Sequence, residues 1–309
     1  MLAWTGAGAK ARPTTLQIRL QRSYPGRVRA GAPVPARSMP TAEVQDNLRY
    51  FTAAGPRVIP VDAVVFTGVG AASRPDLVEL CGYARERGVG RVTLHAGVED
   101  LEGLLTRELP VNLVVLPLQP AEAYGAVSAG AEVVQACRER GIPVASNTVL
   151  TPAALPMLQA VARVAVQGGV QSHGFTFPFP VDGQAEDIPP APRAVAAGAP
   201  AVRLLTEAGV RVWLKGLPGC YLGAAGLSAP TSAGSALTDL IHRSANRWYV
   251  DADHQRERAL MFFPDVVAFF KEDTCRFCAL DGRCDGFFAT FLRRPGFPPL
   301  VPVEAPASA

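Results

Sequence analysis

The sequence predicts an α/β protein whose core is a partial or full barrel of parallel strands surrounded by helices. Short apolar runs, typical of strands, alternate at least five times with amphipathic segments typical of helices. The apolar runs are nearly continuous, which indicates a parallel sheet buried on both faces. This many repeated units favour a barrel, and no glycine-rich dinucleotide fingerprint follows the first strand. A doubly wound open sheet is the alternative.

The first half of the chain shows the clearest alternation. We expect strands at 14–20, 61–66, 91–95 and 112–116, and helices at 41–53, 74–87 and 99–104. The helix over 74–87 has the best-marked beginning, because Ser73 and Asp76 can cap it and Pro75 suits a first turn. Gly88 and Gly90 mark its end.

The second half continues the alternation and then loses it. We expect helices at 132–140, 152–166 and 201–207, strands at 142–145, 174–179 and 210–214, and a Pro/Ala-rich linker at 184–200. From Cys220 onward the periodicity disappears, and a metal would be needed to order so sparse a core. The predicted organisation is a tail at 1–13, a barrel at 14–215, a cysteine-rich module at 216–303 and a tail at 304–309.

The overall composition excludes some classes of protein. Hydrophobic residues make up 49% of the 309 residues and charged residues 18%, which is typical of a globular chain. A net charge of +3 argues against a nucleic-acid partner. No run of about 18 apolar residues suggests a membrane span, and no apolar signal region follows Lys10 and Arg12. We therefore expect a cytoplasmic protein whose thiols stay reduced.

Four cysteines form the strongest chemical pattern. Cys275, Cys278 and Cys284 follow a C-x2-C-x5-C spacing, and Cys220 stands upstream in a Pro-Gly turn. Four converging thiolates suit an iron–sulfur cluster or a structural zinc ion. Burial in the core or disulfide formation is the alternative. Cys81 and Cys137 lie within helical patterns, and we interpret them as packing residues.

The N-terminal region is rich in arginine. Arg22, Arg27, Arg29 and Arg37 belong to a run of basic residues that precedes the first acidic residue, Glu43. Such a run is commonly a solvated face. The alternative is a docking surface for an acidic partner or peptide, because arginine forms bidentate pairs with carboxylates.

Several polar residues follow the predicted strands. In a barrel, the carboxyl ends of the strands face the active site. That rule selects as candidates His95, Gln119, Asn147, Asp182 and Lys215. His173 begins its strand and lies farther from that face. The polar and aromatic segment 246–254 either binds a peptide or small molecule or forms a surface hairpin. No phosphate loop, Ser/His/Asp order or zinc-protease motif is present.

Read together, these pieces resemble the radical S-adenosylmethionine (SAM) superfamily with a C-terminal auxiliary-cluster region of the SPASM or twitch kind. Thr67-Gly68 followed by 74–77 resembles the second strand of that family and its following helix, and 147–150 resembles the end of its fifth strand. The stretch 216–220, the three C-terminal cysteines with Gly286, and 297–302 resemble its auxiliary-cluster frame. The resemblance covers roughly residues 14–303. It implies Cys220, Cys275, Cys278 and Cys284 as ligands of a 4Fe–4S cluster, and Gly68 and Asn147 as cofactor-binding positions.

The departures from the family are as informative as the matches. Its C-x3-C-x2-C motif is missing, because the loop 21–40 contains no cysteine and has Ser23, Arg27 and Ala30 where the spacing would place thiolates. Its Gly-Gly-Glu-Pro motif is replaced by Gly-Val-Gly-Ala at 68–71. The resemblance is thus to a degenerate member that has lost both the radical cluster and the anchor of the SAM amino group.

We therefore interpret the chain as a non-catalytic or accessory iron–sulfur protein. The implied partner is an active radical SAM enzyme or its peptide or small-molecule substrate, in peptide or natural-product modification. The expected cofactor is an iron–sulfur cluster, with zinc as the alternative and without SAM. The first alternative function is a radical SAM oxidoreductase or maturase whose cluster is non-standard or supplied by a partner. The second is a non-radical barrel enzyme using His95, Asn147 or Lys215.

Overall fold

The structure is a computed structural model of the whole chain. The part of the chain that it describes comprises residues 14–21, 38–54, 60–68, 70–97, 100–119, 124–178, 188–224, 227, 247–250, 260–262, 269–281, 284, 286–288, 291 and 297–304.

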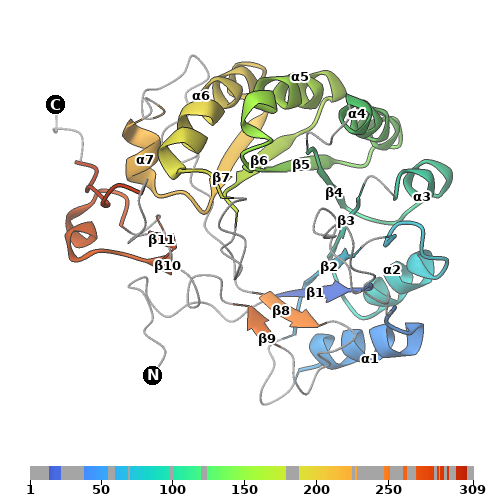
Figure 1. Cartoon of the computed structure of the whole chain (residues 1–309). Coiled ribbons are helices and arrows are strands. Elements are labelled where there is room, and N and C mark those ends of the chain that lie inside the picture. Colours follow the sequence, from blue (N-terminus) through green and yellow to red (C-terminus); the bar gives the residue numbers. More distant parts are fainter. Residues whose placement is uncertain are drawn as a thin grey trace.

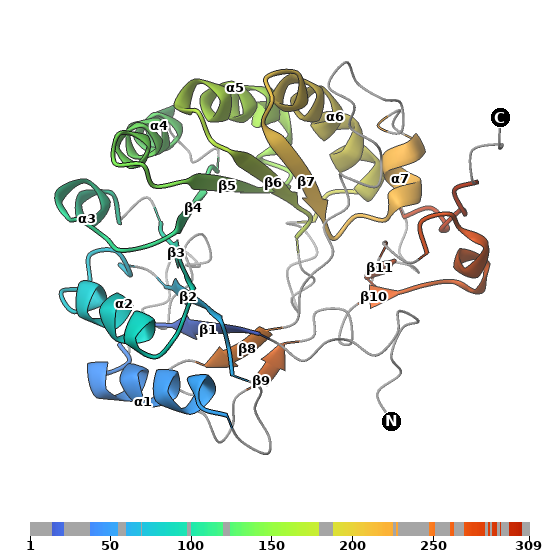
Figure 2. The ribbon, with the colours of Figure 1, turned by 180° about the vertical axis from the view of Figure 1, so that it is seen from behind.

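The core is a curved sheet of nine strands in the order β7-β6-β5-β4-β3-β2-β1-β8-β9. Neighbouring strands from β7 to β8 all pair in parallel. The helices lie along the outside of the curve, and the two ends of the sheet do not pair with each other (Figures 1 and 2). This arrangement is a partial β/α barrel, which confirms the predicted fold class.

The elements follow one another in the predicted alternation. The strands of the barrel are β1 (Thr15–Arg19), β2 (Ala63–Thr67), β3 (Arg91–His95), β4 (Leu113–Pro117), β5 (Val144–Val149), β6 (Ser172–Thr176) and β7 (Arg211–Lys215). The helices between them are α1 (Thr41–Thr52), α2 (Leu77–Glu86), α3 (Leu101–Thr106), α4 (Tyr124–Glu139), η2 (Leu155–Met157), α5 (Leu158–Gly168) and α6 (Ala191–Glu207). Beyond the barrel come α7 (Gly219–Ala224), β8 (Arg247–Val250), β9 (Leu260–Phe262), β10 (Phe269–Phe270), η5 (Asp273–Phe277) and β11 (Phe287–Phe288).

Successive side chains of each strand point to opposite faces of the sheet. One face forms the apolar core with the helices, and the other lines the interior of the barrel. Leu16 and Ile18 of β1 are fully buried and belong to the main apolar cluster, whereas Gln17 between them lies on the opposite face. The same alternation places polar side chains of the strands on the inner wall of the barrel. These residues are Gln17, Thr67, Thr93, His95, Asn147, Thr176 and Lys215. The apolar faces pack against the helices and provide most of the driving force for folding.

The expected linker at 184–200 is wrong for most of its length, because α6 begins at Ala191. The segment carries many alanines, which have the highest helix propensity, and Pro192 stands in the first turn, where proline is tolerated. Pro200 lies inside the helix and removes one backbone hydrogen bond. Proline content alone therefore misled the sequence interpretation. Likewise α4 begins at Tyr124, eight residues before the predicted helix at 132–140.

The last two strands of the main sheet come from an unexpected part of the chain. β8 pairs in parallel with β1, with Leu16 opposite Trp248, and β9 pairs antiparallel with β8. The sequence analysis assigned these residues to the cysteine-rich module or to a surface hairpin. Part of the range 216–303 therefore belongs to the main sheet and not to a separate module. The remainder of the predicted domain division stays a prediction.

A network of hydrogen bonds fixes the two ends of the arginine-rich loop. Gln21 and Ser38 form an antiparallel bridge. The Arg74 guanidinium, 8% exposed, donates to the Met39 carbonyl at 2.7 Å and pairs with both carboxylate oxygens of Asp76. Arg74 also lowers the pKa of Asp76 through these hydrogen bonds. Arg22, Arg27, Arg29 and Arg37 themselves lie outside the described residues, so the docking-surface hypothesis stays a prediction.

None of the helices in the described part of the chain has the length and apolar character that a membrane crossing requires.

Candidate metal centre

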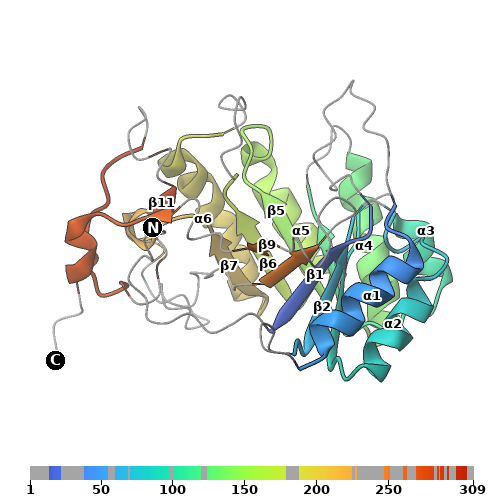
Figure 3. The same ribbon diagram turned by 90° about the horizontal axis from the view of Figure 1, so that it is seen from below.

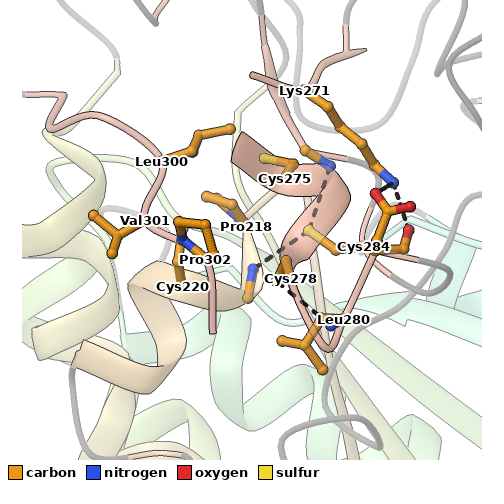
Figure 4. A pocket seen from close by; sticks show the side chains of 13 residues that line it. Pro218, Cys220, Lys271, Cys275, Cys278, Leu280, Cys284, Leu300, Val301 and Pro302 are labelled. Carbon is orange, nitrogen blue, oxygen red and sulfur yellow. Dashed lines mark hydrogen bonds and ion pairs between the residues drawn. The ribbon is translucent and has the colours of Figure 1, made fainter. Parts of the chain in front are cut away.

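Three distant segments of the chain build one pocket around the four predicted cysteines. Cys220 comes from the start of α7, which follows β7 after a short turn. Cys275 lies in η5, Cys278 immediately follows it, and Cys284 lies a few residues later. All four line a single pocket, and the C-terminal segment 300–302 forms its remaining wall (Figure 4).

Backbone amides point at the sulfur atoms of this pocket. Gly219 and Gly286 donate to Cys284 Sγ at 3.5 and 3.3 Å. Leu280 and Val303 donate to Cys278 Sγ at 3.4 and 3.3 Å. Amide donors of this kind stabilise sulfur atoms that carry negative charge. The pocket is therefore suited to thiolates.

Burial favours the protonated form of two of these thiols, Cys220 and Cys275. The pKa of Cys220 is raised to about 11, mainly by burial and to a smaller extent by nearby Cys284 and Cys275. Burial also raises the pKa of Cys275, and that of the neighbouring Tyr221 hydroxyl to about 12. A bound metal therefore has to displace protons from the pocket.

The donor set fits a thiolate-bound centre. All six cysteines are free thiols, so the structure contains no disulfide, and four of these thiols line one pocket. In the described residues, no three His, Cys, Asp or Glu side chains form a ready group around a single ion.

Packing of aromatic rings fixes this module to the barrel. Phe177, just after β6, contacts the rings of Phe287, Phe291 and Phe297 at centroid distances of 5.7, 5.8 and 6.5 Å. Phe291 and Phe297 stack at 5.0 Å. Figure 3 shows the module at the end of the molecule, beyond α6. The sequence analysis did not identify this aromatic cluster.

Two further contacts close the loop that carries the cysteines. β10 pairs antiparallel with β11, and Lys271 forms an ion pair with Asp281 at 2.8 Å. Gly286 has a φ of +87°, and a Cβ there would lie 2.1 Å from the Phe270 carbonyl oxygen. This position therefore requires glycine.

The barrel-rim candidates are dispersed around the inner wall. His95 ends β3, Lys215 ends β7, and Gln119 follows β4. Asn147 of β5 accepts a hydrogen bond from Thr176 of β6, with 2.8 Å between Oδ1 and Oγ1. Asp182 lies outside the described residues.

Gly68 follows β2 in a conformation that other residues rarely adopt. Its φ is +125°, and a Cβ there would lie 2.9 Å from the Gln21 backbone nitrogen. The side chain of Gln21 lies next to Gly70. The turn therefore brings the ends of β1 and β2 into close contact, and a cofactor role for Gly68 stays a prediction.

His173 is a core residue, which the sequence had placed only at the start of its strand, away from the active-site face. Its ring is fully buried, 2.7 Å from Ser146 Oγ through Nδ1 and 3.3 Å from Thr148 Oγ1 through Nε2. Burial lowers its pKa to about 3. The imidazole is therefore neutral at physiological pH and supports packing.

We expect His173 to make the fold sensitive to acid. The unfolded chain binds a proton near pH 6.5 and the folded chain near pH 3, so the free energy of unfolding falls as the pH falls between these values. The slope is about 1.4 kcal/mol per pH unit. The free energy of unfolding, measured with urea at pH 7 and pH 5, should show this dependence in the wild type and not in His173→Asn. An equal pH dependence of the free energy of unfolding in both proteins would show that His173 is not its cause.

Cys81 and Cys137 are buried packing residues, as predicted. Burial raises the pKa of Cys81 to about 12, which leaves it an unreactive thiol.

Comparison with solved structures identifies the architecture. SuiB of Streptococcus suis bound to S-adenosylmethionine matches with a TM-score of 0.56 and 14% identity, over 95% of this chain and 76% of SuiB. The enzyme anSMEcpe with bound AdoMet matches with a TM-score of 0.55 and 12% identity, over 89% of this chain and 85% of that one. The fold is that of radical SAM enzymes. At these identities, the likeness shows the fold alone.

Sequence comparison adds no family assignment. No protein-family model matches the chain, and no curated protein matches it. SuiB has also been solved with its precursor peptide SuiA, with a TM-score of 0.51 over 77% of this chain and 57% of SuiB. SuiB and anSMEcpe were both solved with SAM bound, and the expectation that this chain works without SAM stays a prediction.

Proposed function

We propose that this chain is an accessory iron–sulfur protein of the radical SAM type, which binds a peptide that a partner enzyme modifies. The observation that carries the proposal is the convergence of Cys220, Cys275, Cys278 and Cys284 on one pocket lined with amide donors. This pocket lies directly beyond the carboxyl end of β7, on the side of a barrel where ligands bind.

A self-sufficient radical enzyme is disfavoured by the sequence between β1 and α1. That loop contains no cysteine, so it offers no thiolates to hold a cluster whose open iron could bind SAM. The four cysteines that remain form a complete set of ligands by themselves. We therefore assign the metal a structural or electron-transfer role.

An iron–sulfur cluster is favoured over zinc. The fold is shared with radical SAM enzymes, which use such clusters. The chain supplies the four thiolates that a 4Fe–4S cluster requires, and the amides at the pocket would stabilise its sulfur atoms. When bound, the cluster would supply one-electron transfer at the barrel rim.

A peptide is the favoured ligand because SuiB, which shares the fold, has been solved with its precursor peptide. A peptide would meet the inner wall near Asn147, Thr176 and Lys215. These groups offer hydrogen bonds and a positive charge to a backbone or an acidic side chain.

The experiment is anaerobic purification followed by analysis of iron, sulfide and zinc. We expect near-stoichiometric cluster content, and under dithionite with SAM we expect 5′-deoxyadenosine to stay at background. A preparation without iron or zinc would refute the metal centre. Sustained 5′-deoxyadenosine formation would instead favour the second candidate, a SAM-using enzyme whose cluster is non-standard or supplied by a partner.

A further inference from the structure

The C-terminal segment contributes more than a wall to the metal pocket. Val303 donates its amide to Cys278 Sγ at 3.3 Å, and the amide of Val301 donates to Cys220. The two sulfurs belong to segments far apart in the sequence. A single short segment therefore contacts a ligand from each side of the pocket.

The segment is held firmly in this position. Leu300 is 4% exposed, the Val303 carbonyl accepts the Ala279 amide at 2.9 Å, and the Tyr221 hydroxyl donates to the Pro298 carbonyl. Pro302 restricts Val301 to an extended conformation. The amides at 301 and 303 are thus presented to the pocket by packing on both sides.

We propose that the amides of Val301 and Val303 are positioning groups of the metal centre, which tie its two halves together and set its reduction potential. This inference rests on the proposed function. Hydrogen bonds to cluster sulfurs stabilise the more negative, reduced state, so they raise the potential. They also hold the ligand-bearing segments in place, which slows the loss of metal.

The test compares Val303→Pro with Val303→Ala. Both variants lose the valine side chain, but proline also lacks the N–H. We expect the proline variant to have a lower midpoint potential in a spectroelectrochemical titration and to release metal to a chelator several-fold faster. The alanine variant should stay close to wild type in both measurements. If the bound metal is zinc, the rate of metal release to the chelator is the only one of the two measurements that tests the inference.

Equal potentials and equal release rates in the two variants would overturn the inference while leaving the proposed function intact. A wild-type protein without metal would instead remove the proposed function. Urea unfolding of the barrel, followed by the fluorescence of Trp248 and Trp213, checks that both variants are folded. If Val303→Pro is unfolded, Val301→Pro and Val301→Ala give the same comparison at Cys220.

Discussion

Cys278→Ala should lose most of the bound metal. Cys278 receives two amide hydrogen bonds, from Leu280 and Val303, and lines the pocket together with Cys275 and Cys284. Three thiolates can still hold metal weakly, so we expect affinity to fall by on the order of tenfold or more. Iron and sulfide analysis after anaerobic gel filtration measures the loss.

The matched control is Cys137→Ala. This cysteine is buried in α4 and does not line the pocket, so its replacement should cost stability while leaving the metal content unchanged. Equal metal loss in both variants would show that the effect is general destabilisation. Full retention of metal by Cys278→Ala would remove Cys278 from the ligand set.

Gly286→Ala should open the cysteine-rich module. The new methyl group would overlap the Phe270 carbonyl, and the residue would keep a left-handed φ that costs about 1–2 kcal/mol. Backbone on both sides must shift, which breaks the pairing of β10 with β11 and moves the amide that contacts Cys284. We expect metal content to fall and limited proteolysis near residue 270 to become faster.

Gly88→Ala is the control for backbone strain. Gly88 has a φ of +86°, but a Cβ there meets nothing within 4 Å. Gly88→Ala should lower the free energy of unfolding only by the cost of holding alanine in a left-handed conformation. The metal content should stay at the wild-type level. If Gly88→Ala and Gly286→Ala behave alike, the overlap with Phe270 is not the cause.

The barrel could be predicted because its signals are local. Apolar runs such as Ala63 to Phe66, which is followed by Thr67-Gly68, mark strands whatever their partners are. The convergence of Cys275 and Cys278 was readable because ligand spacing lies within a few residues. Their place in one pocket with Cys220 is a tertiary fact that the sequence could suggest only through the family resemblance.

Most of the missed features depend on distant partners. Nothing around Val303 indicates that its amide contacts a cysteine, because every residue except proline has an amide. Phe177 and Phe297 form one cluster only after the chain has folded. The first part of α6, residues 191–200, was missed for a different reason, since proline and alanine compete as signals and alanine prevailed.

The pairing of β1 with β8 makes the sheet depend on the order of synthesis. Leu16 leaves the ribosome early, whereas its partner Trp248 is made after all of the other barrel strands. The edge of β1 that later pairs with β8 therefore stays unpaired while β2 to β7 assemble on the other side of β1. Closing so long a loop is slow, which makes the docking of β8 a late folding step. Trp248, which packs on Phe51 at 5.5 Å, is placed to report that step by its fluorescence.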